Sequence, residues 1–170
     1  MVLRSRYFCN KCGENHDFLY GTALNYDTGR VFKIPENWGT DKYVRRDSQE
    51  ALRLLVLDDD VVEAAYNFIP QCDEFPNKYL YKHDDFICTE CQLTESYFFF
   101  SLKNRNGERF YPHYKCPACG GKMRLAEAYI RDNGAVPKRF RCNKCGEIQS
   151  MGEPDEYECL DYRITECLKL

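Results

Sequence analysis

The sequence contains no long apolar segment and none of several short motifs that mark common enzyme classes. Its longest apolar runs are short ones such as LLVL and YFFF, far below the roughly 18 residues of a membrane span. The start, MVLRSRYFCN, has no apolar segment behind its positive charges, so no secretory signal is expected and the cytoplasm is the expected compartment. The patterns GxxxxGK followed by Ser or Thr, GxSxG, HExxH and HxE are missing, which argues against the nucleotide-binding, hydrolase, metalloprotease and zinc-deaminase classes that use them.

Cysteine, in contrast, is abundant: the chain of 170 residues has 11 cysteines and only 3 histidines. An odd number of cysteines without an expected export signal argues for reduced thiols rather than a disulfide framework. Most of the cysteines fall into four CxxC pairs, which are Cys9 with Cys12, Cys88 with Cys91, Cys116 with Cys119, and Cys142 with Cys145. The hexapeptide CNKCGE occurs at both the first and the last pair.

Each CxxC pair is predicted to form a knuckle, a tight turn in which both thiolates bind one metal ion. Zinc takes four such ligands at about 2.3 Å in a tetrahedron, so the four pairs predict two Zn²⁺ ions, each in a closed structural site made of four cysteines. Gly13, Gly120 and Gly146 follow the second cysteine of three pairs, and glycine allows the positive φ that lets backbone amides point at the sulfurs. Gln92 stands at this place in the second pair, which is the exception.

The segment CPACGGKM, a predicted hairpin and then RFRCNKCGE resemble the zinc-ribbon class over about residues 116–147. Outside these residues the chain resembles tandem CxxC zinc-knuckle proteins only loosely, through its other cysteine pairs. The resemblance implies a small three-stranded fold held by a metal ion. It implies no single function, because the class contains nucleic-acid binders, polymerase-associated modules and purely structural domains.

Two hairpins of suitable length compete for the third cysteine pair. One spans the 22 residues to Cys142 with the turn DNG, and the other spans the 24 residues from Cys91 with a turn at Asn106 and Gly107. Sequential pairing, which joins the first pair to the second and the third to the fourth, is the favoured arrangement. In the main alternative the pairs are nested and the two CNKCGE copies meet, and an interleaved arrangement is the third. Rubredoxin-like iron is an alternative to zinc, whereas a redox CxxC lacks the βαβ context that it needs.

The chain is expected to be a β-rich α+β protein built from two small zinc-stabilised modules. Residues 1–100 are predicted to form a zinc-bound β module with a helical insertion at about 47–69. Residues 101–150 are predicted to form the zinc ribbon. Residues 151–170 are predicted to be a C-terminal element that docks on the body or binds a partner.

The helical insertion is predicted from a change of hydrophobic period in RRDSQEALRLLVLDDDVVEAAYNFIP. Two short helices are expected, with Asp47 and Asp60 as capping residues. The acidic triplet at residues 58–60 is therefore interpreted as a helix break and cap rather than a metal or catalytic site. Two strands around a turn at residues 27–29 are expected before the helices, and one strand leading into Cys88 is expected after them.

Positive charge is concentrated in one part of a chain whose net charge is −3. Residues 1–91 have 11 Lys and Arg against 16 Asp and Glu, residues 92–150 have 11 against 5, and residues 151–170 have 2 against 6. Cations beside aromatic rings are typical of proteins that bind single-stranded nucleic acid. The candidate phosphate contacts are Arg105, Arg109, Arg124, Arg131, Lys138, Arg139 and Arg141, and the rings among them are Phe98, Phe110, Tyr111, Tyr114 and Phe140. Part of this charge can instead offset the charge of −2 on a zinc ion with four thiolates, and rings in small domains usually form the core.

These observations favour a non-enzymatic zinc-binding protein whose basic ribbon contacts nucleic acid or the transcription or translation machinery. The acidic first module and the apolar tail favour the alternative, a protein–protein interaction adaptor or regulator. A hydrolase or nuclease rests only on His16 and His83, each of which is followed by an aspartate. Both histidines are expected to be exposed polar residues near the knuckles, no catalytic residue is assigned, and no membrane partner is expected.

Overall fold

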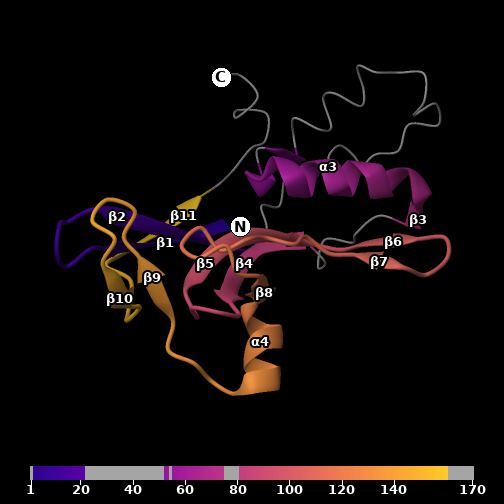
Figure 1. Cartoon of the computed structure of the whole chain (residues 1–170). Coiled ribbons are helices and arrows are strands. Elements are labelled where there is room, and N and C mark those ends of the chain that lie inside the picture. The colour runs from indigo at the N-terminus through magenta and orange to yellow at the C-terminus, as the bar shows by residue number, and fades with distance from the viewer. Residues whose placement is uncertain (1, 22–51, 54, 75–80, 161–170) are drawn as a thin grey trace. The chain divides into compact units, whose positions relative to one another are not determined.

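A computed structural model describes residues 2–21, 52–53, 55–74 and 81–160 (Figure 1). As predicted, the described part of the chain is β-rich, with antiparallel sheets and an α-helix inside the expected insertion, whereas a second α-helix at Ala126–Asn133 was not expected. The strands predicted around residues 27–29 and the predicted cap Asp47 lie outside the described residues. Among the described residues, no helix has both the length and the apolar character that crossing a membrane requires.

The chain alternates between strands and a few short helices. The strands are β1 (Val2–Phe8), β2 (Asn15–Gly21), β3 (Cys72–Glu74), β4 (Tyr81–Cys88), β5 (Thr94–Phe100), β6 (Leu102–Asn104), β7 (Arg109–Phe110), β8 (Met123–Leu125), β9 (Arg139–Arg141), β10 (Ile148–Ser150) and β11 (Glu156–Leu160). The helices are α3 (Asp59–Phe68), the 3-10 helix η1 (Ile69–Gln71) and α4 (Ala126–Asn133).

The chain divides into two compact units. The first comprises Met1–Gly21, His83–Tyr97 and His113–Asp161, and the second comprises Thr22–Lys82, Phe98–Pro112 and Tyr162–Leu170. Each unit is thus assembled from stretches that are distant in the sequence. Strand pairing within the first unit joins residues 2–6 to residues 156–160, and Gly21 to His83.

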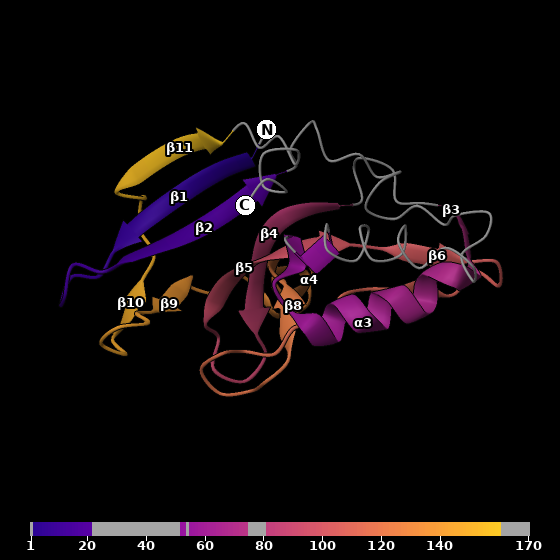
Figure 2. The same ribbon diagram turned by 90° about the horizontal axis from the view of Figure 1, so that it is seen from above.

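The first unit contains a sheet in the order β11-β1-β2-β4-β5, and β8 also pairs with β4 (Figure 2). β1 pairs antiparallel with β2 on one side and with β11 on the other, so the first part of the predicted C-terminal element docks as a strand. One core cluster contains Tyr7, Phe18 and Phe140, with the rings of Tyr7 and Phe18 5.6 Å apart in an edge-to-face arrangement. A second cluster packs helix α4 on β4 through Ile87 and Tyr129.

The second unit contains α3, η1 and the three strands β3, β6 and β7. The predicted helix break is confirmed, since Asp58 precedes α3 and its side chain accepts a 3.1 Å hydrogen bond from the Val61 amide. The capping residue is Asp58 rather than Asp60, because the helix already begins at Asp59. The turn at Asn106 and Gly107 does connect two antiparallel strands, β6 and β7, as predicted.

Candidate metal centres

The eight paired cysteines gather into two clusters. Centre 1 consists of Cys9, Cys12, Cys142 and Cys145, and centre 2 consists of Cys88, Cys91, Cys116 and Cys119. Within each cluster all sulfurs lie within 4.8 Å of one another. The favoured sequential pairing is therefore wrong, and the nested alternative, in which the two CNKCGE copies meet, describes the structure.

Strand pairing explains why the pairs are nested. Each knuckle is itself the turn of a β-hairpin. The first, second and fourth knuckles connect paired strands, and the third lies between Lys115 and Lys122, which form an isolated β-bridge. β4 pairs with β8, which places the second and third knuckles side by side. The predicted hairpin between the third and fourth knuckles is wrong, because residues 126–133 form helix α4 and its turn signal DNG supplies the helix C-cap, Gly134 at φ 83°. The knuckle–hairpin–knuckle order of the zinc-ribbon class therefore fits residues 88–119 better than residues 116–147.

The four knuckles share one backbone geometry. The amide of the first cysteine donates to the carbonyl five residues later, and the amide of the fifth residue donates back to the first cysteine, as in Cys9 to Glu14 and Gly13 to Cys9, both at 2.8 Å. The residue after the second cysteine has a positive φ in every knuckle, with values of 71°, 75° and 73° at the three glycines. The predicted role of these glycines is confirmed. Gln92 adopts the same conformation at φ 59°, which a side chain makes less favourable.

The distances between sulfurs fit a tetrahedral metal ion. Across centre 1 the Sγ atoms of Cys9 and Cys145 are 3.5 Å apart, as are those of Cys12 and Cys142. In centre 2 the Cys88–Cys119 and Cys91–Cys119 distances are 3.5 Å and the Cys91–Cys116 distance is 3.6 Å. Four ligands at about 2.3 Å from a central ion stand about 3.8 Å apart, whereas a disulfide requires about 2.05 Å.

The ionisation of the thiols also favours a cation at each centre. Burial opposes ionisation of Cys9, but the amides of Lys11 and Cys12 donate to its sulfur and lower its pKa to about 6. Cys88 behaves in the same way, and its pKa falls to about 7 despite burial. In the other direction, burial and contact with neighbouring thiols raise the pKa of Cys91 to about 12. Four crowded sulfurs therefore cannot all ionise by themselves, and a divalent cation would supply the missing compensation.

Centre 1 has a reciprocal arrangement of charges that follows from the repeated hexapeptide. Lys11 of the first copy pairs with Glu147 of the second at 3.2 Å, and Lys144 of the second copy pairs with Glu14 of the first at 3.4 Å. Lysine and glutamate stand at the same two places in both copies, so each copy binds the other through the same pair of side chains. The two copies of CNKCGE thus form one self-complementary site rather than parts of two separate sites.

Polar groups outside the cysteines complete both centres. Gln149 on β10 donates its Nε2 to Cys9 Sγ at 2.9 Å, and its Oε1 accepts from the Asn10 amide at 3.0 Å. Gly121 donates its amide to Cys119 Sγ at 3.4 Å. Such groups orient the ligand sulfurs and offset their charge. Sequence reasoning missed both residues, although the second glycine of CPACGG was a visible signal for Gly121.

The histidines occupy different environments from those predicted. His16 and His83 are only 8% and 7% exposed, so the expectation of exposed residues is wrong for both. His16 lies 3.2 Å from Glu95 and stacks on Phe140, while its neighbour Asp17 hydrogen-bonds Arg6. Successive residues of a strand point to opposite faces, which explains why His16 and Asp17 do not form a pair. Burial lowers the pKa of His83 to about 4.

The seven candidate phosphate contacts are divided between the two units. Arg105 and Arg109 belong to the second unit, and the other five belong to the first. Arg124 and Arg131 both pair with Asp132, at 2.6 and 3.5 Å. Two further cations also have partners, since Lys138 pairs with the buried Asp85 and Arg139 donates to the Cys91 carbonyl. Arg141 is exposed and lines a groove of about 480 Å³ together with Glu95, Pro117 and Lys144.

The predicted aromatic contacts belong mostly to the core. Phe98 and Tyr114 are each 1% exposed and Phe140 is 2% exposed, whereas Tyr111 is 42% exposed. Of these rings, Tyr111 is therefore the one that offers a substantial exposed surface, and it stacks on Phe99 with their centroids 6.2 Å apart.

The described geometry is consistent with a zinc-ribbon-like class of protein, since each cluster joins two CxxC knuckles. Comparisons of the chain with family models, with curated proteins and with solved structures find no match.

Proposed function

We propose that the two clusters are structural zinc centres of a non-enzymatic binding protein. The observation that supports this proposal is the grouping of the eight sulfurs into two sets of four at tetrahedral spacing. A set of four thiolates leaves no ligand position for water, and closed sites of this kind stabilise folds rather than activate substrates. Cys9, Cys12, Cys142 and Cys145 would hold one ion, and Cys88, Cys91, Cys116 and Cys119 would hold the other.

Each ion would hold together parts of the first unit that lie far apart in the sequence. The described core cluster beside centre 1 has three buried members, Tyr7, Phe18 and Phe140. Small domains commonly add a metal to the stabilisation that their core supplies. Centre 1 would also close a far longer loop than centre 2, so its metal would restrict the unfolded chain more strongly.

Metal analysis of paired cysteine variants tests both the metal and the pairing. Native mass spectrometry of the intact chain is expected to show two zinc ions. The variant C9S/C142S damages one centre twice and is expected to keep one ion, whereas C9S/C88S damages both centres and is expected to lose both. The reverse result would support sequential pairing and contradict the structure. Iron in place of zinc would correct the metal, and a metal-free folded chain would reject the proposal.

A second candidate function is contact with single-stranded nucleic acid through the β6–β7 hairpin. Arg105 and Arg109 are exposed there, and neither forms an ion pair with any residue that the structure describes. Tyr111 follows them with an exposed ring. Unpaired cations beside a ring can bind phosphates and stack on a base.

The test compares two double variants, one that removes arginines without an ion pair among the described residues and one that removes arginines paired with Asp132. R105A/R109A is expected to weaken binding of a single-stranded oligonucleotide and to reduce its dependence on salt, because two phosphate contacts are lost. R124A/R131A removes the same charge from residues that are paired with Asp132 and is expected to have less effect. Equal effects of the two variants, or no binding at low salt, would reject this function.

A further inference from the structure

Strand β11 lies at the edge of the sheet in the first unit, with β1 as its neighbour (Figure 2). Its residues pair with β1 in antiparallel register from Val2 opposite Leu160 to Arg6 opposite Glu156. The described side chains of β11, at residues 156–158, are exposed, and Tyr157 is 63% exposed. The described part of β11 therefore adds no buried side chain to the core.

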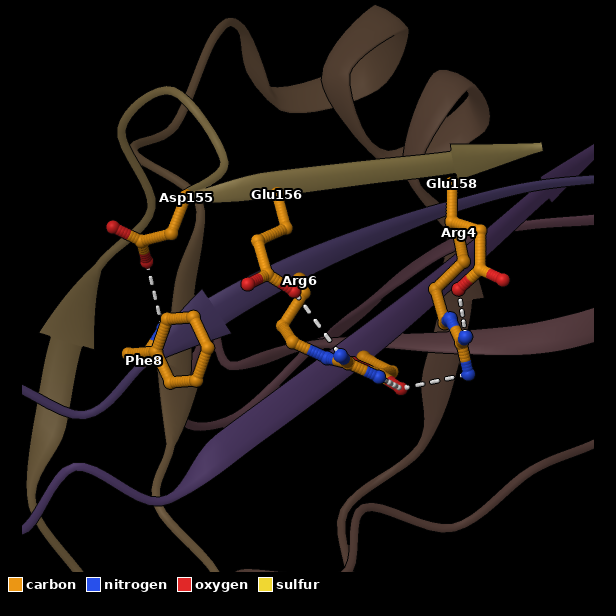
Figure 3. Close-up of polar contacts among 7 residues, drawn as sticks. Arg4, Arg6, Phe8, Asp155, Glu156 and Glu158 are labelled. Carbon is orange, nitrogen blue, oxygen red and sulfur yellow. Dashed lines mark hydrogen bonds and ion pairs between the residues drawn. The ribbon is translucent and has the colours of Figure 1, made fainter.

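Ion pairs and backbone hydrogen bonds hold β11 on β1 (Figure 3). Arg4 pairs with Glu158, and Arg6 pairs with Glu156 at 3.1 Å. The carboxylate of Asp155 accepts from the Phe8 amide at 2.8 Å. Carboxylates at alternate positions of one strand thus match arginines at alternate positions of the other, which is how one face of a paired strand is recognised.

The arginines keep their positions by contacts that do not involve β11. Arg6 binds Asp17 on β2 with two parallel hydrogen bonds, from Nε at 2.7 Å and from Nη2 at 3.0 Å. Arg4 lies 3.5 Å from the same carboxylate. Asp17 therefore holds both guanidinium groups in place, and Nη1 of Arg6 remains available for Glu156. A receptor that is ordered before its ligand arrives loses less entropy on binding.

We propose that the outer edge of β1 is a binding site for an extended acidic segment of a partner protein, and that β11 is the occupant of this site in the free chain. The partner strand presents two carboxylates two residues apart to Arg4 and Arg6 and hydrogen-bonds its backbone to β1. Strand addition of this kind gains affinity from main-chain hydrogen bonds and specificity from alternate side chains. Nucleic acid offers negative charge but no peptide backbone to pair with β1.

The experiment displaces β11 by charge and supplies the acidic strand as a peptide. In the full chain, E156K/E158K places lysines opposite Arg4 and Arg6 and is expected to release β11. E127K/E153K makes the same change of charge at exposed residues outside the strand and is the control. The probe is a fluorescent peptide of residues 153–160 with C159S. The control peptide is the same peptide with E156K and E158K.

The acidic peptide is expected to bind the E156K/E158K chain about tenfold more tightly than it binds the control chain. The peptide with reversed charge is expected to bind neither chain. Raising the salt from about 50 to about 500 mM is expected to weaken the binding, because it screens exposed charges. Equal binding to both chains, indifference to the charge of the peptide, or equal competition by an oligonucleotide would overturn the proposal.

Amide hydrogen exchange shows whether β11 has left β1. In the E156K/E158K chain the amides of β11 are expected to lose protection while those of β2 keep it. If β2 loses protection as well, E156Q/E158Q replaces the variant, because it removes the attraction without adding repulsion. Protection of β11 at the wild-type level in both variants would overturn the proposal, since the ion pairs would then not hold the strand.

Discussion

Gly121 is the residue whose substitution tests centre 2 most directly. A Cβ atom at this position would lie 2.6 Å from Glu90 Cγ and 3.0 Å from Cys88 Sγ. The glutamate side chain is flexible and can rotate away, but the Cys88 sulfur could not move without disturbing the ligand geometry that the proposed metal ion requires. Overpacking of this kind costs about 1–3 kcal/mol. Gly121→Ala is therefore expected to weaken metal binding at centre 2 by about 5- to 150-fold.

Competition with a graded chelator measures this effect. One of the two metal ions is expected to leave Gly121→Ala at a lower chelator concentration than in the wild type, while the other leaves at an unchanged concentration. Gly152→Ala is the control, because nothing lies within 4 Å of its added Cβ. Adding Glu90→Ala to Gly121→Ala is expected to restore little of the affinity, since the contact with Cys88 Sγ remains. Retention of both ions as tightly as in Gly152→Ala would refute the reasoning.

Three further changes test single interactions. Gln92→Gly removes a side chain at φ 59° and is expected to raise the free energy of unfolding, measured in urea, by up to about 1 kcal/mol. Gly120→Gln adds a side chain at φ 75° and is expected to lower the free energy of unfolding by about 1 kcal/mol. Changes of the same sign in the two variants would contradict this prediction. Lys11→Glu is expected to lower stability only slightly because the ion pair with Glu147 is exposed, and adding Glu147→Lys is expected to restore it. Because the pKa of His83 is about 4 in the folded chain and about 6.5 when unfolded, the wild type is expected to lose stability as the pH falls from 6.5 to 4, by up to about 3 kcal/mol. His83→Gln is expected to be less sensitive over this range, and an unchanged slope would show that His83 does not cause it.

Local chemistry was readable from the sequence. The spacing of the cysteines identified all eight sulfurs, and the glycines after three pairs identified the positive φ that the knuckles require. The acidic triplet at residues 58–60 was correctly interpreted as a helix cap. These features depend on neighbours within a few residues, where the type of side chain decides the backbone conformation.

The pairing of the knuckles was not readable, because it depends on strand pairing between distant residues. The sequence DNG indicates a hairpin turn and a helix end about equally well, and here Gly134 caps α4. The first strand, Val2–Phe8, was missed because charged Arg4 and Arg6 interrupt its apolar residues. That strand directly precedes Cys9 of centre 1. Without it, nothing in the sequence indicated which strands bring the first knuckle to the fourth.

The histidines show a similar limit. A His-Asp dipeptide suggests a catalytic pair when only the sequence is considered, but in a strand the two side chains point to opposite faces of the sheet. His16 meets Glu95 instead, a residue 79 positions away in the sequence. Partners at such separation follow only from the sheet order.

The nested arrangement of the cysteines also sets an order of events on the ribosome. Centre 2 has all its ligands once Cys119 has emerged, whereas Cys9 and Cys12 wait for Cys142 and Cys145. At translation rates of about 5–20 residues per second, the interval between the synthesis of Cys12 and that of Cys145 lasts roughly 7 to 27 seconds. During this interval Cys9 and Cys12 lack the other half of centre 1, so a metal ion bound there would have only two of its four cysteine ligands.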